Sequence, residues 1–168
     1  MSVPHAAPAR AEVALADRAA TRRLARRLAR LARPGDVIGL GGALGAGKTT
    51  LARDFIAALA GQDLEVPSPT FTLVQTYELG AVTVWHFDLY RIVAPDEVFE
   101  LGFEDALAEG VSLIEWPERL GALLPADRLD VTLEQGPAPD ARVARLAAYG
   151  SWVARLPTLI DHGDGADG

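Results

Sequence analysis

The stretch that decides the fold of this chain is Gly42-Ala43-Leu44-Gly45-Ala46-Gly47-Lys48-Thr49, which fits the pattern G-x-x-x-x-G-K-[ST] at every fixed position. A short apolar run, residues 37–40, precedes it, and a helix-forming segment, residues 48–61, overlaps its end. Glycines let the backbone curl so that successive N–H groups face phosphate oxygens, and the helix turns its positive end toward the same anion. The stretch therefore predicts a phosphate-binding loop between a buried strand and a helix.

Lys48 is the single lysine of a chain that holds 16 Lys and Arg residues in all. Loops of this pattern place a slim, point-like ammonium group on the β- and γ-phosphates of a triphosphate, and this is the one position where the chain has Lys in place of Arg. The hydroxyl of Thr49 is the group that ligates Mg²⁺ in loops of this pattern. We therefore expect a nucleoside triphosphate and Mg²⁺ to bind here. The expected contacts within the loop are Gly42, Gly45, Ala46, Gly47, Lys48, Thr49 and Thr50.

A site of this kind needs a carboxylate at the end of a neighbouring strand, where it holds the metal shell and orients the nucleophile. Two apolar runs end in an acid: residues 82–87 lead to Asp88, and residues 111–114 lead to Glu115. Both acids should emerge at the rim of the sheet beside the loop. Either acid alone is also consistent with a surface residue that caps the next element. The predicted catalytic residues are Lys48, Asp88 and Glu115, and the predicted metal ligands are Thr49, Asp88 and Glu115.

Composition places the chain among globular α/β proteins. Its 168 residues suit a single domain, and 49% of them are apolar. No apolar run nears the roughly 18–20 residues that cross a bilayer, and no secretory signal is visible, so we expect a cytoplasmic protein without membrane contact. The chain has no cysteine, which excludes disulfides and thiolate metal sites, and its three histidines show no ligand spacing.

The element pattern predicts a P-loop NTPase fold over residues 1–160: one domain with a central, mostly parallel sheet, an antiparallel hairpin and flanking helices. Residues 161–168 are predicted to form a disordered acidic tail. Strands are expected at 12–16, 37–40, 70–78, 82–87, 111–114, 129–134 and 142–148, with the third and fourth forming the hairpin. Helices are expected from the N-cap Asp17 to Ala32 and at 48–61, 95–101, 103–108, 118–124 and 151–160.

Charge is distributed unevenly along the chain. Residues 1–33 carry eight arginines against Glu12 and Asp17, a net charge of +6, and residues 34–168 carry −13, which gives the total of −7. The acidic body would repel a polyanion. The arginines of the first helix fit contact with RNA or with an acidic protein surface, and they also fit a solvated helix face.

Further candidates lie near the predicted site. Ser68 and Thr70, in a proline-containing loop, could offer a hydroxyl to magnesium or to the attacking water, although ordinary turn chemistry explains them as well. Trp116 could stack on a base or belong to the core. Arg91 could neutralise the transferring charge or be a surface arginine.

Four strings together carry a resemblance to a known family. They are Gly45-Ala46-Gly47-Lys48-Thr49-Thr50, Ser68-Pro69-Thr70-Phe71-Thr72-Leu73-Val74, His86-Phe87-Asp88-Leu89-Tyr90-Arg91 and Ile114-Glu115-Trp116-Pro117-Glu118. In this order and spacing the chain resembles the TsaE (YjeE) family of small bacterial ATPases, from about Thr21 to Arg142. Its first helix is richer in arginine than the family pattern.

The resemblance implies a role in forming N6-threonylcarbamoyladenosine at position 37 of tRNAs that read ANN codons. It implies that the protein acts with a TsaB–TsaD complex, that ATP hydrolysis allows repeated cycles, and that tRNA is involved indirectly. By motif match, Thr49 and Glu115 would ligate magnesium, Asp88 would belong to the metal shell or position the water, and Thr21 and Arg142 would contact the nucleotide. The alternatives are a small-molecule kinase on the same scaffold and a non-catalytic ATP-dependent adaptor.

Overall fold

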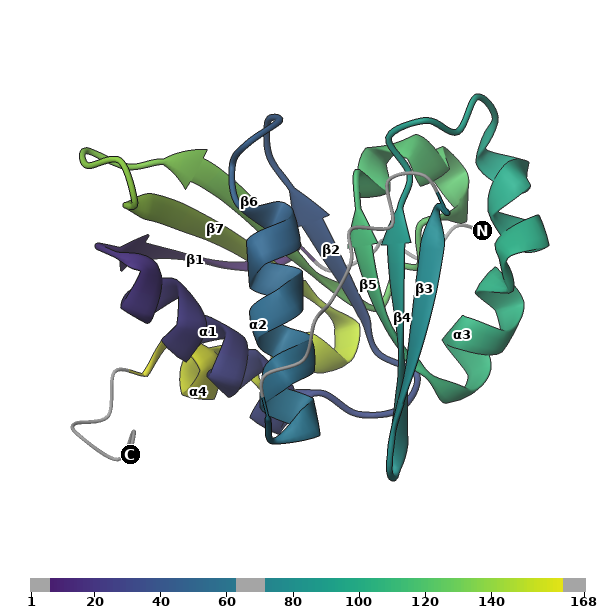
Figure 1. Cartoon of the computed structure of the whole chain (residues 1–168), viewed down its shortest axis with the longest axis horizontal. Helices are drawn as coiled ribbons and strands as arrows, with labels where there is room; N and C mark the ends of the chain where they lie inside the picture. The colour runs from purple at the N-terminus through teal and green to yellow at the C-terminus, as the bar shows by residue number, and fades with distance from the viewer. Residues whose placement is uncertain (1–6, 63–71, 162–168) are drawn as a thin grey trace.

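A seven-stranded sheet in the order β1-β7-β6-β2-β5-β4-β3 runs through the computed structural model, which describes residues 7–62 and 72–161 (Figure 1). β2 pairs in parallel with β5 and β6, and β5 pairs in parallel with β4, whereas β1, β7 and β3 join by antiparallel pairing. The strands are β1 Ala9–Leu15, β2 Val37–Gly41, β3 Val74–Leu79, β4 Val82–Asp88, β5 Val111–Glu115, β6 Arg128–Gln135 and β7 Arg142–Tyr149. The predicted α/β fold, with its parallel centre and the β3–β4 hairpin, is confirmed.

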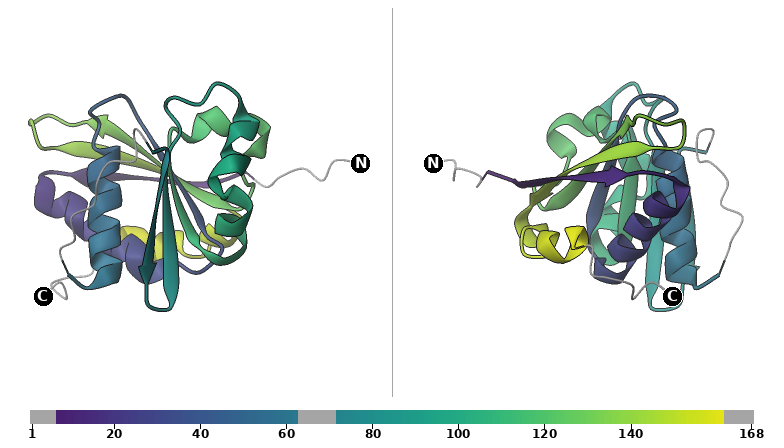
Figure 2. Two further views of the ribbon diagram at one scale, coloured as in Figure 1. Left: turned by 45° about the vertical axis from the view of Figure 1, so that its right-hand side comes forward. Right: turned by 90° about the vertical axis from the view of Figure 1, so that its left-hand side faces the viewer.

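Helices cover both faces of this sheet (Figures 1 and 2). One apolar cluster joins α1 and α2 to the sheet, and a second joins η1, α3 and η2 to its other face. The helices are α1 Arg18–Leu31, α2 Lys48–Ala60, α3 Phe103–Glu109 and α4 Leu156–Ile160, with 3-10 turns η1 Pro95–Leu101, η2 Pro117–Leu123 and η3 Gly150–Trp152. Both faces of β2 are covered. Accordingly, its side chains Val37, Ile38 and Leu40 are all apolar and buried. In the described parts of the chain, no helix is long and apolar enough to span a membrane.

Local chemistry sets the ends of the helices α1 and α2. Asp17 caps α1, since its carboxylate accepts a hydrogen bond from the backbone N–H of Ala20 at 2.9 Å. Leu24 and Leu28 lie on the buried face of α1, while its arginines lie outward or at the edges. α2 ends where Gly61 adopts a left-handed conformation, with φ of 70°. The expected boundaries of both helices agree closely with these ends.

Several elements differ from the sequence-based expectation: β1 begins at Ala9 instead of residue 12, and the helices expected at 95–101 and 118–124 are 3-10 turns. The hairpin strand expected from residue 70 begins at Val74, after Leu73 with a positive φ of 67°; residues 70 and 71 lie outside the described chain. The single closing helix expected at 151–160 is wrong, because it is divided into η3 and α4. The ring of Pro157 would clash with the carbonyl group four residues earlier in a continuous helix, so α4 begins just before it and holds the proline in its first turn.

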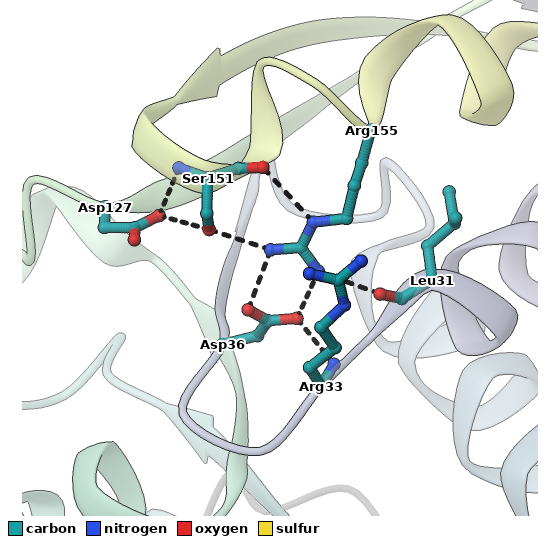
Figure 3. A network of polar contacts seen from close by, with 6 residues as sticks. All are labelled: Leu31, Arg33, Asp36, Asp127, Ser151 and Arg155. Carbon is teal, nitrogen blue, oxygen red and sulfur yellow. Dashed lines mark hydrogen bonds and ion pairs between the residues drawn. The ribbon is translucent and has the colours of Figure 1, made fainter.

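A buried ion pair fastens this C-terminal part to the sheet (Figure 3). The guanidinium of Arg155 donates to both carboxylate oxygens of Asp36, at 2.6 and 2.9 Å, and to the carbonyl oxygen of Leu31 at 2.8 Å. It also donates to the hydroxyl of Ser151, which in turn donates to Asp127 at 2.8 Å. The network therefore joins the end of α1, the start of β2 and the segment before α4.

Replacing Arg155 with Met is expected to lower the free energy of unfolding by about 2 kcal/mol, because Asp36 would lose its bidentate partner. The loss stays below that of a fully orphaned charge, since Asp36 still accepts a hydrogen bond from the backbone N–H of Arg33. Urea unfolding measures the change. The matched control is Asp36→Leu/Arg155→Met, which removes both charges and should be less destabilised than the single variant; a double variant that is worse would contradict this account.

Candidate functional site

The loop of residues 42–47 lies at the carboxyl end of β2, beside the carboxyl ends of β4 and β5. The sheet order puts β5 directly next to β2, and register pairs Asp88 of β4 with Glu115 of β5. A cleft of about 390 Å³ opens at this rim. It is lined by Leu44, Gly45, Gly47, Lys48, Thr49, Thr50, Asp88, Tyr90, Arg91, Glu115, Trp116 and Arg142. The fold thus brings the two acids predicted from separate strands to the phosphate loop.

The loop backbone has the conformation that its glycines permit. Gly42, Gly45 and Gly47 have φ values of 128°, 79° and 105°, which residues with a side chain rarely adopt. Gly47 directly precedes α2, so the N–H groups of the first turn of the helix face the cleft. The curled loop and the helix end together offer a concentration of backbone donors suited to phosphate oxygens.

The space for a side chain at Gly42 is also limited by β6, which lies outside the loop. A Cβ at this position would lie 2.5 Å from the carbonyl oxygen of Leu133 in β6. We expect Gly42→Ala to lower the free energy of unfolding by about 2 kcal/mol, from the strained φ and the displaced backbone, and to weaken nucleotide binding. Gly45→Ala is the matched control, since it has a positive φ but no atom within 4 Å of the new Cβ. Thermal unfolding should place the control between wild type and Gly42→Ala; the reverse order would contradict the assignment.

Lys48 is held by its own loop. Its Nζ donates to the carbonyl oxygens of Gly42 and Ala43 at 2.7 and 2.8 Å, and lies 4.1 Å from the centre of the Trp116 ring. Burial lowers the pKa of Lys48, and the nearby charges of Glu115, Glu118 and Asp88 partly offset that effect by raising it. An ammonium group in this position gains from an incoming polyanion, because phosphate oxygens supply both charge and acceptors.

A chain of polar contacts runs from α2 to the interior of the sheet. The hydroxyl of Thr49 donates to Oε1 of Glu115 at 2.8 Å, and Nε2 of His86 lies 2.6 Å from Oε2 of the same carboxylate. Glu115 and His86 are 2% and 0% exposed. Because a carboxylate oxygen accepts, the proton of the Thr49 hydroxyl points to Glu115, which leaves a lone pair of the hydroxyl for a cation.

His86 was missed as a site residue by sequence reasoning. It precedes Asp88 by two positions in β4, and the alternation of strand side chains puts both on the same face, a signal that was available. Among the described residues its Nδ1 finds no hydrogen-bond partner, and its Nε2 is the atom that contacts Glu115. His86 therefore orients the acid from behind.

The donor set fits a magnesium ion that is shared with phosphates. Thr49, Asp88 and Glu115 all line the cleft, and Asp88 is 5% exposed with one oxygen accepting from the backbone N–H of Tyr90 at 3.1 Å. Within residues 7–62 and 72–161, no group of three His, Asp or Glu side chains is placed to hold a metal by itself. Mg²⁺ commonly takes one or two protein oxygens and completes its shell with phosphate and water, so this site suits it.

Arg142 supports the loop from β7. Its Nε donates to the carbonyl oxygen of Ala46 at 2.8 Å, and its Nη1 donates to the carbonyl oxygens of Pro139 and Ala141, both at 2.8 Å. Ala46 itself is buried. Arg142 lies at the edge of the cleft, and the hydrogen bonds described here join it to backbone carbonyl groups.

Aromatic rings close the opposite edge. Trp116 and Tyr90 have ring centres 4.9 Å apart, and Tyr90 is exposed. Trp116 is partly buried against the apolar cluster of η1, α3 and η2 and has a left-handed backbone, with φ of 62°. Both interpretations of Trp116 thus find support, since the ring packs on the core and also lines the cleft. Tyr90 is a second lining residue that sequence reasoning did not single out.

The remaining candidates are placed differently. Thr21 is 4% exposed on the packed face of α1 and is not among the residues lining the cleft. Arg91 is exposed and lines the cleft. Ser68 and Thr70 lie outside the described residues. The site is therefore assembled from the loop, α2, the ends of β4 and β5, and the start of β7.

Known proteins share both the sequence and this architecture. A sequence model of the family described as threonylcarbamoyl adenosine biosynthesis protein TsaE matches residues 15–143. The tRNA threonylcarbamoyladenosine biosynthesis protein TsaE of Rickettsia felis is 45% identical over 114 residues, which cover 68% of this chain and 67% of that protein. The TsaE protein of Bacillus subtilis is 37% identical over 132 residues, which cover 78% and 81% of the two chains.

A solved structure has the same fold. The crystal structure of Bacillus subtilis YdiB superposes with a TM-score of 0.72 at 28% sequence identity, covering 94% of this chain and 98% of that one. The family match spans the phosphate loop, both acids and the start of β7, so it includes the whole of the cleft described above. The chain therefore belongs to the TsaE family, whose members take part in tRNA threonylcarbamoyladenosine biosynthesis.

Proposed function

We propose that this protein is a Mg²⁺-dependent ATPase that acts with a TsaB–TsaD complex to form N6-threonylcarbamoyladenosine at position 37 of tRNAs reading ANN codons. The observation that carries the catalytic part is the 2.8 Å hydrogen bond between Thr49 and Glu115 inside the phosphate-loop cleft. It joins the loop to a strand-end acid, which is the arrangement that phosphoryl transfer on this scaffold requires. The family's role in tRNA modification supports the biological part.

In this proposal the triphosphate lies along the loop and the first turn of α2. Backbone N–H groups of Gly45, Gly47 and the following residues bind phosphate oxygens. Lys48 exchanges the carbonyl oxygens of Gly42 and Ala43 for the β- and γ-phosphates. The exchange lets the chain hold its lysine in place before ATP arrives, at little cost in reorganisation.

The base and the sugar of the nucleotide have fewer partners in fixed positions than the phosphates have. Trp116 offers the face of a ring at the cleft edge, while Arg142 holds the loop through Ala46 and is close enough to the cleft to reach an exposed phosphate. Thr50 lines the cleft beside Thr49 and contributes a further hydroxyl. Thr21 is proposed only on the family resemblance, because it is buried in α1.

Thr49, Asp88 and Glu115 are the proposed magnesium ligands, either directly or through water. The ion supplies positive charge that offsets the charge of the β- and γ-phosphates. Asp88 and Glu115 also accept hydrogen bonds from the attacking water and so orient it toward the γ-phosphorus. Water adds there as the bond to the bridging oxygen breaks, giving ADP and phosphate.

Hydrolysis by the isolated protein is expected to be slow. Of the two arginines that line the cleft, Arg142 donates to three backbone carbonyls and Arg91 is exposed at the rim. Rapid phosphoryl transfer to water needs an arginine or equivalent cation fixed on the γ-phosphate. A partner that moves Arg91 onto the γ-phosphate, or that brings its own cation, would complete the site.

The test is an ATPase assay of the full chain with and without the TsaB–TsaD pair, together with measurement of modified adenosine on a tRNA substrate. The proposal expects phosphate release that rises with the pair present, and modification over many cycles only when this protein is added. Phosphate release and modification that both ignore the protein would overturn it. A phosphorylated metabolite formed from ATP would indicate a kinase, and ATP binding without hydrolysis in the complete mixture would indicate an adaptor.

A further inference from the structure

A groove of about 660 Å³ lies between α1 and α2, which pack side by side on one face of the sheet (Figure 1). Its lining residues are Arg22, Arg26, Ala29, Arg30, Asp54, Ala57, Ala58, Leu59, Gly61 and Gln62. The groove is larger than the cleft of the phosphate loop, and none of the described lining residues is common to the two. The nucleotide site described above therefore leaves it without a role.

The charge of the groove comes from a regular stripe on α1. Arg22, Arg26 and Arg30 are each exposed and follow one another at intervals of four residues. Residues at this spacing lie one above another on a helix, about 6 Å apart, so the stripe extends for about 12 Å. Three guanidinium groups in a row match a ligand with repeated negative charges, rather than a single small anion.

The acid in the groove is already paired. Asp54 of α2 accepts from Arg18 at 3.0 Å, and its side chain is only 13% exposed. The negative charge of Asp54 therefore neutralises the charge of Arg18 more than the charge of the stripe. The rest of the chain beyond residue 33 has a net charge of −13, so a polyanion would be repelled by most of the surface and attracted on this side.

We infer that this groove binds the phosphate backbone of RNA, an inference that rests on the family's role in tRNA modification and makes the RNA contact direct. Among the described residues, no aromatic side chain lines the groove, so the groove as described offers no ring on which a base could stack and favours binding that is independent of sequence. Ala29, Ala57 and Ala58 are among its lining residues, and their short side chains offer little apolar surface to the anchor residues of a partner helix. These features favour a phosphodiester strand over an acidic protein helix.

The groove and the phosphate-loop cleft lie at opposite ends of α2. Thr49 belongs to the first turn of the helix, whereas Ala57, Ala58 and Gly61 lie at its last turn and C-cap. At 1.5 Å per residue, the two ends are about 15 Å apart. RNA in the groove can thus be bound while the cleft holds a nucleotide, and each site can be altered alone.

The experiment measures binding of a fluorescein-labelled tRNA transcript, which carries no base modifications, to the full chain by fluorescence anisotropy. The salt concentration is varied about fourfold, from roughly 50 to 200 mM. Three phosphate contacts predict a slope of roughly −2 to −3 in a plot of log affinity against log salt. Arg22→Gln/Arg26→Gln should weaken binding at least about tenfold at the lowest salt and reduce the slope by roughly two-thirds. Glutamine keeps the helix propensity of α1.

Arg10→Gln/Arg23→Gln is the matched control, because it also removes two positive charges, but from exposed positions outside the groove. This control should stay within about threefold of wild type. Equal losses in the two double variants, or no tRNA binding by wild type, would overturn the inference. Binding of polyglutamate in preference to tRNA would also overturn it and assign the groove to an acidic protein.

Measurements with ATP distinguish a failure of this inference from a failure of the proposed function. Both double variants should bind ATP as the wild type does, since neither changes a residue of the cleft. If wild-type protein bound tRNA through the groove but failed to hydrolyse ATP with TsaB–TsaD, the ATPase proposal would fail while this inference stood. The converse result would reject the RNA groove alone.

Discussion

Lys48→Ala is expected to lower the affinity for Mg·ATP by about 100-fold or more. The ammonium group would make two charge-assisted hydrogen bonds to phosphates, each worth roughly 1.5–3 kcal/mol. Part of this is offset, because in the free protein the same group already donates to Gly42 and Ala43. The net difference is about 3 kcal/mol, which corresponds to the 100-fold change.

The pattern across nucleotides identifies the role of the lysine more sharply than the loss itself. A contact with the β- and γ-phosphates predicts a large loss for ATP, a smaller one for ADP and little change for AMP, which isothermal titration can compare. An equal loss for all three would indicate a collapsed loop instead. Wild-type affinity for ATP in Lys48→Ala would refute the binding scheme.

Two controls keep this prediction specific. Arg23→Ala removes one positive charge from an exposed position outside the cleft and should leave ATP affinity unchanged. Lys48→Arg keeps the charge but replaces a slim ammonium by a planar fork, which does not fit between the two loop carbonyls and the Trp116 ring. Lys48→Arg should therefore bind ATP far more weakly than wild type, and thermal unfolding of each variant checks that the fold persists.

The sequence could predict the parts of this site that depend on local pattern. The glycine spacing required a curled loop, and the apolar runs ending in Asp88 and Glu115 required strands whose ends meet the loop once the sheet is parallel. Those inferences needed only the chain order. The sheet confirms them by pairing Asp88 directly with Glu115.

Other parts depend on contacts between segments far apart in the chain. The bond from Arg142 to the carbonyl of Ala46 joins positions 96 residues apart, and it exists because β7 returns beside the loop. The stacking of Trp116 under Lys48 needs a left-handed backbone at a non-glycine residue, which no propensity predicts. His86 was readable in principle from strand alternation, but its role required knowing that it contacts Glu115 of the neighbouring strand.

The basic helix shows how the same sequence pattern acquires a sharper meaning in three dimensions. Eight arginines in residues 1–33 were compatible with a solvated face or with a polyanion site. The fold sorts them, because Arg22, Arg26 and Arg30 line a groove while Arg18 pairs with Asp54. Charge alone did not distinguish these cases, since the distinction depends on which face of α1 meets α2.

Glu115→Gln is expected to reduce the turnover of ATP by about 100- to 1,000-fold while affinity for ATP stays within about tenfold of wild type. The amide keeps the shape of the side chain but has one oxygen where the carboxylate has two. It cannot accept from both Thr49 and His86, which lie at 2.8 and 2.6 Å from separate oxygens. Phosphate release in the presence of TsaB–TsaD measures turnover, and titration of magnesium should show a higher concentration at half-saturation.

The control for this variant is Glu118→Gln, which removes an exposed carboxylate close enough to Lys48 to raise its pKa. Turnover in Glu118→Gln should be near wild type, so a comparable loss there would show that general charge, rather than the Thr49 contact, governs the rate. Asp88→Asn separates the two acids further. It leaves the Thr49–Glu115 bond intact, and a higher magnesium requirement in Glu115→Gln than in Asp88→Asn would make Glu115 the acid that sets the metal through Thr49.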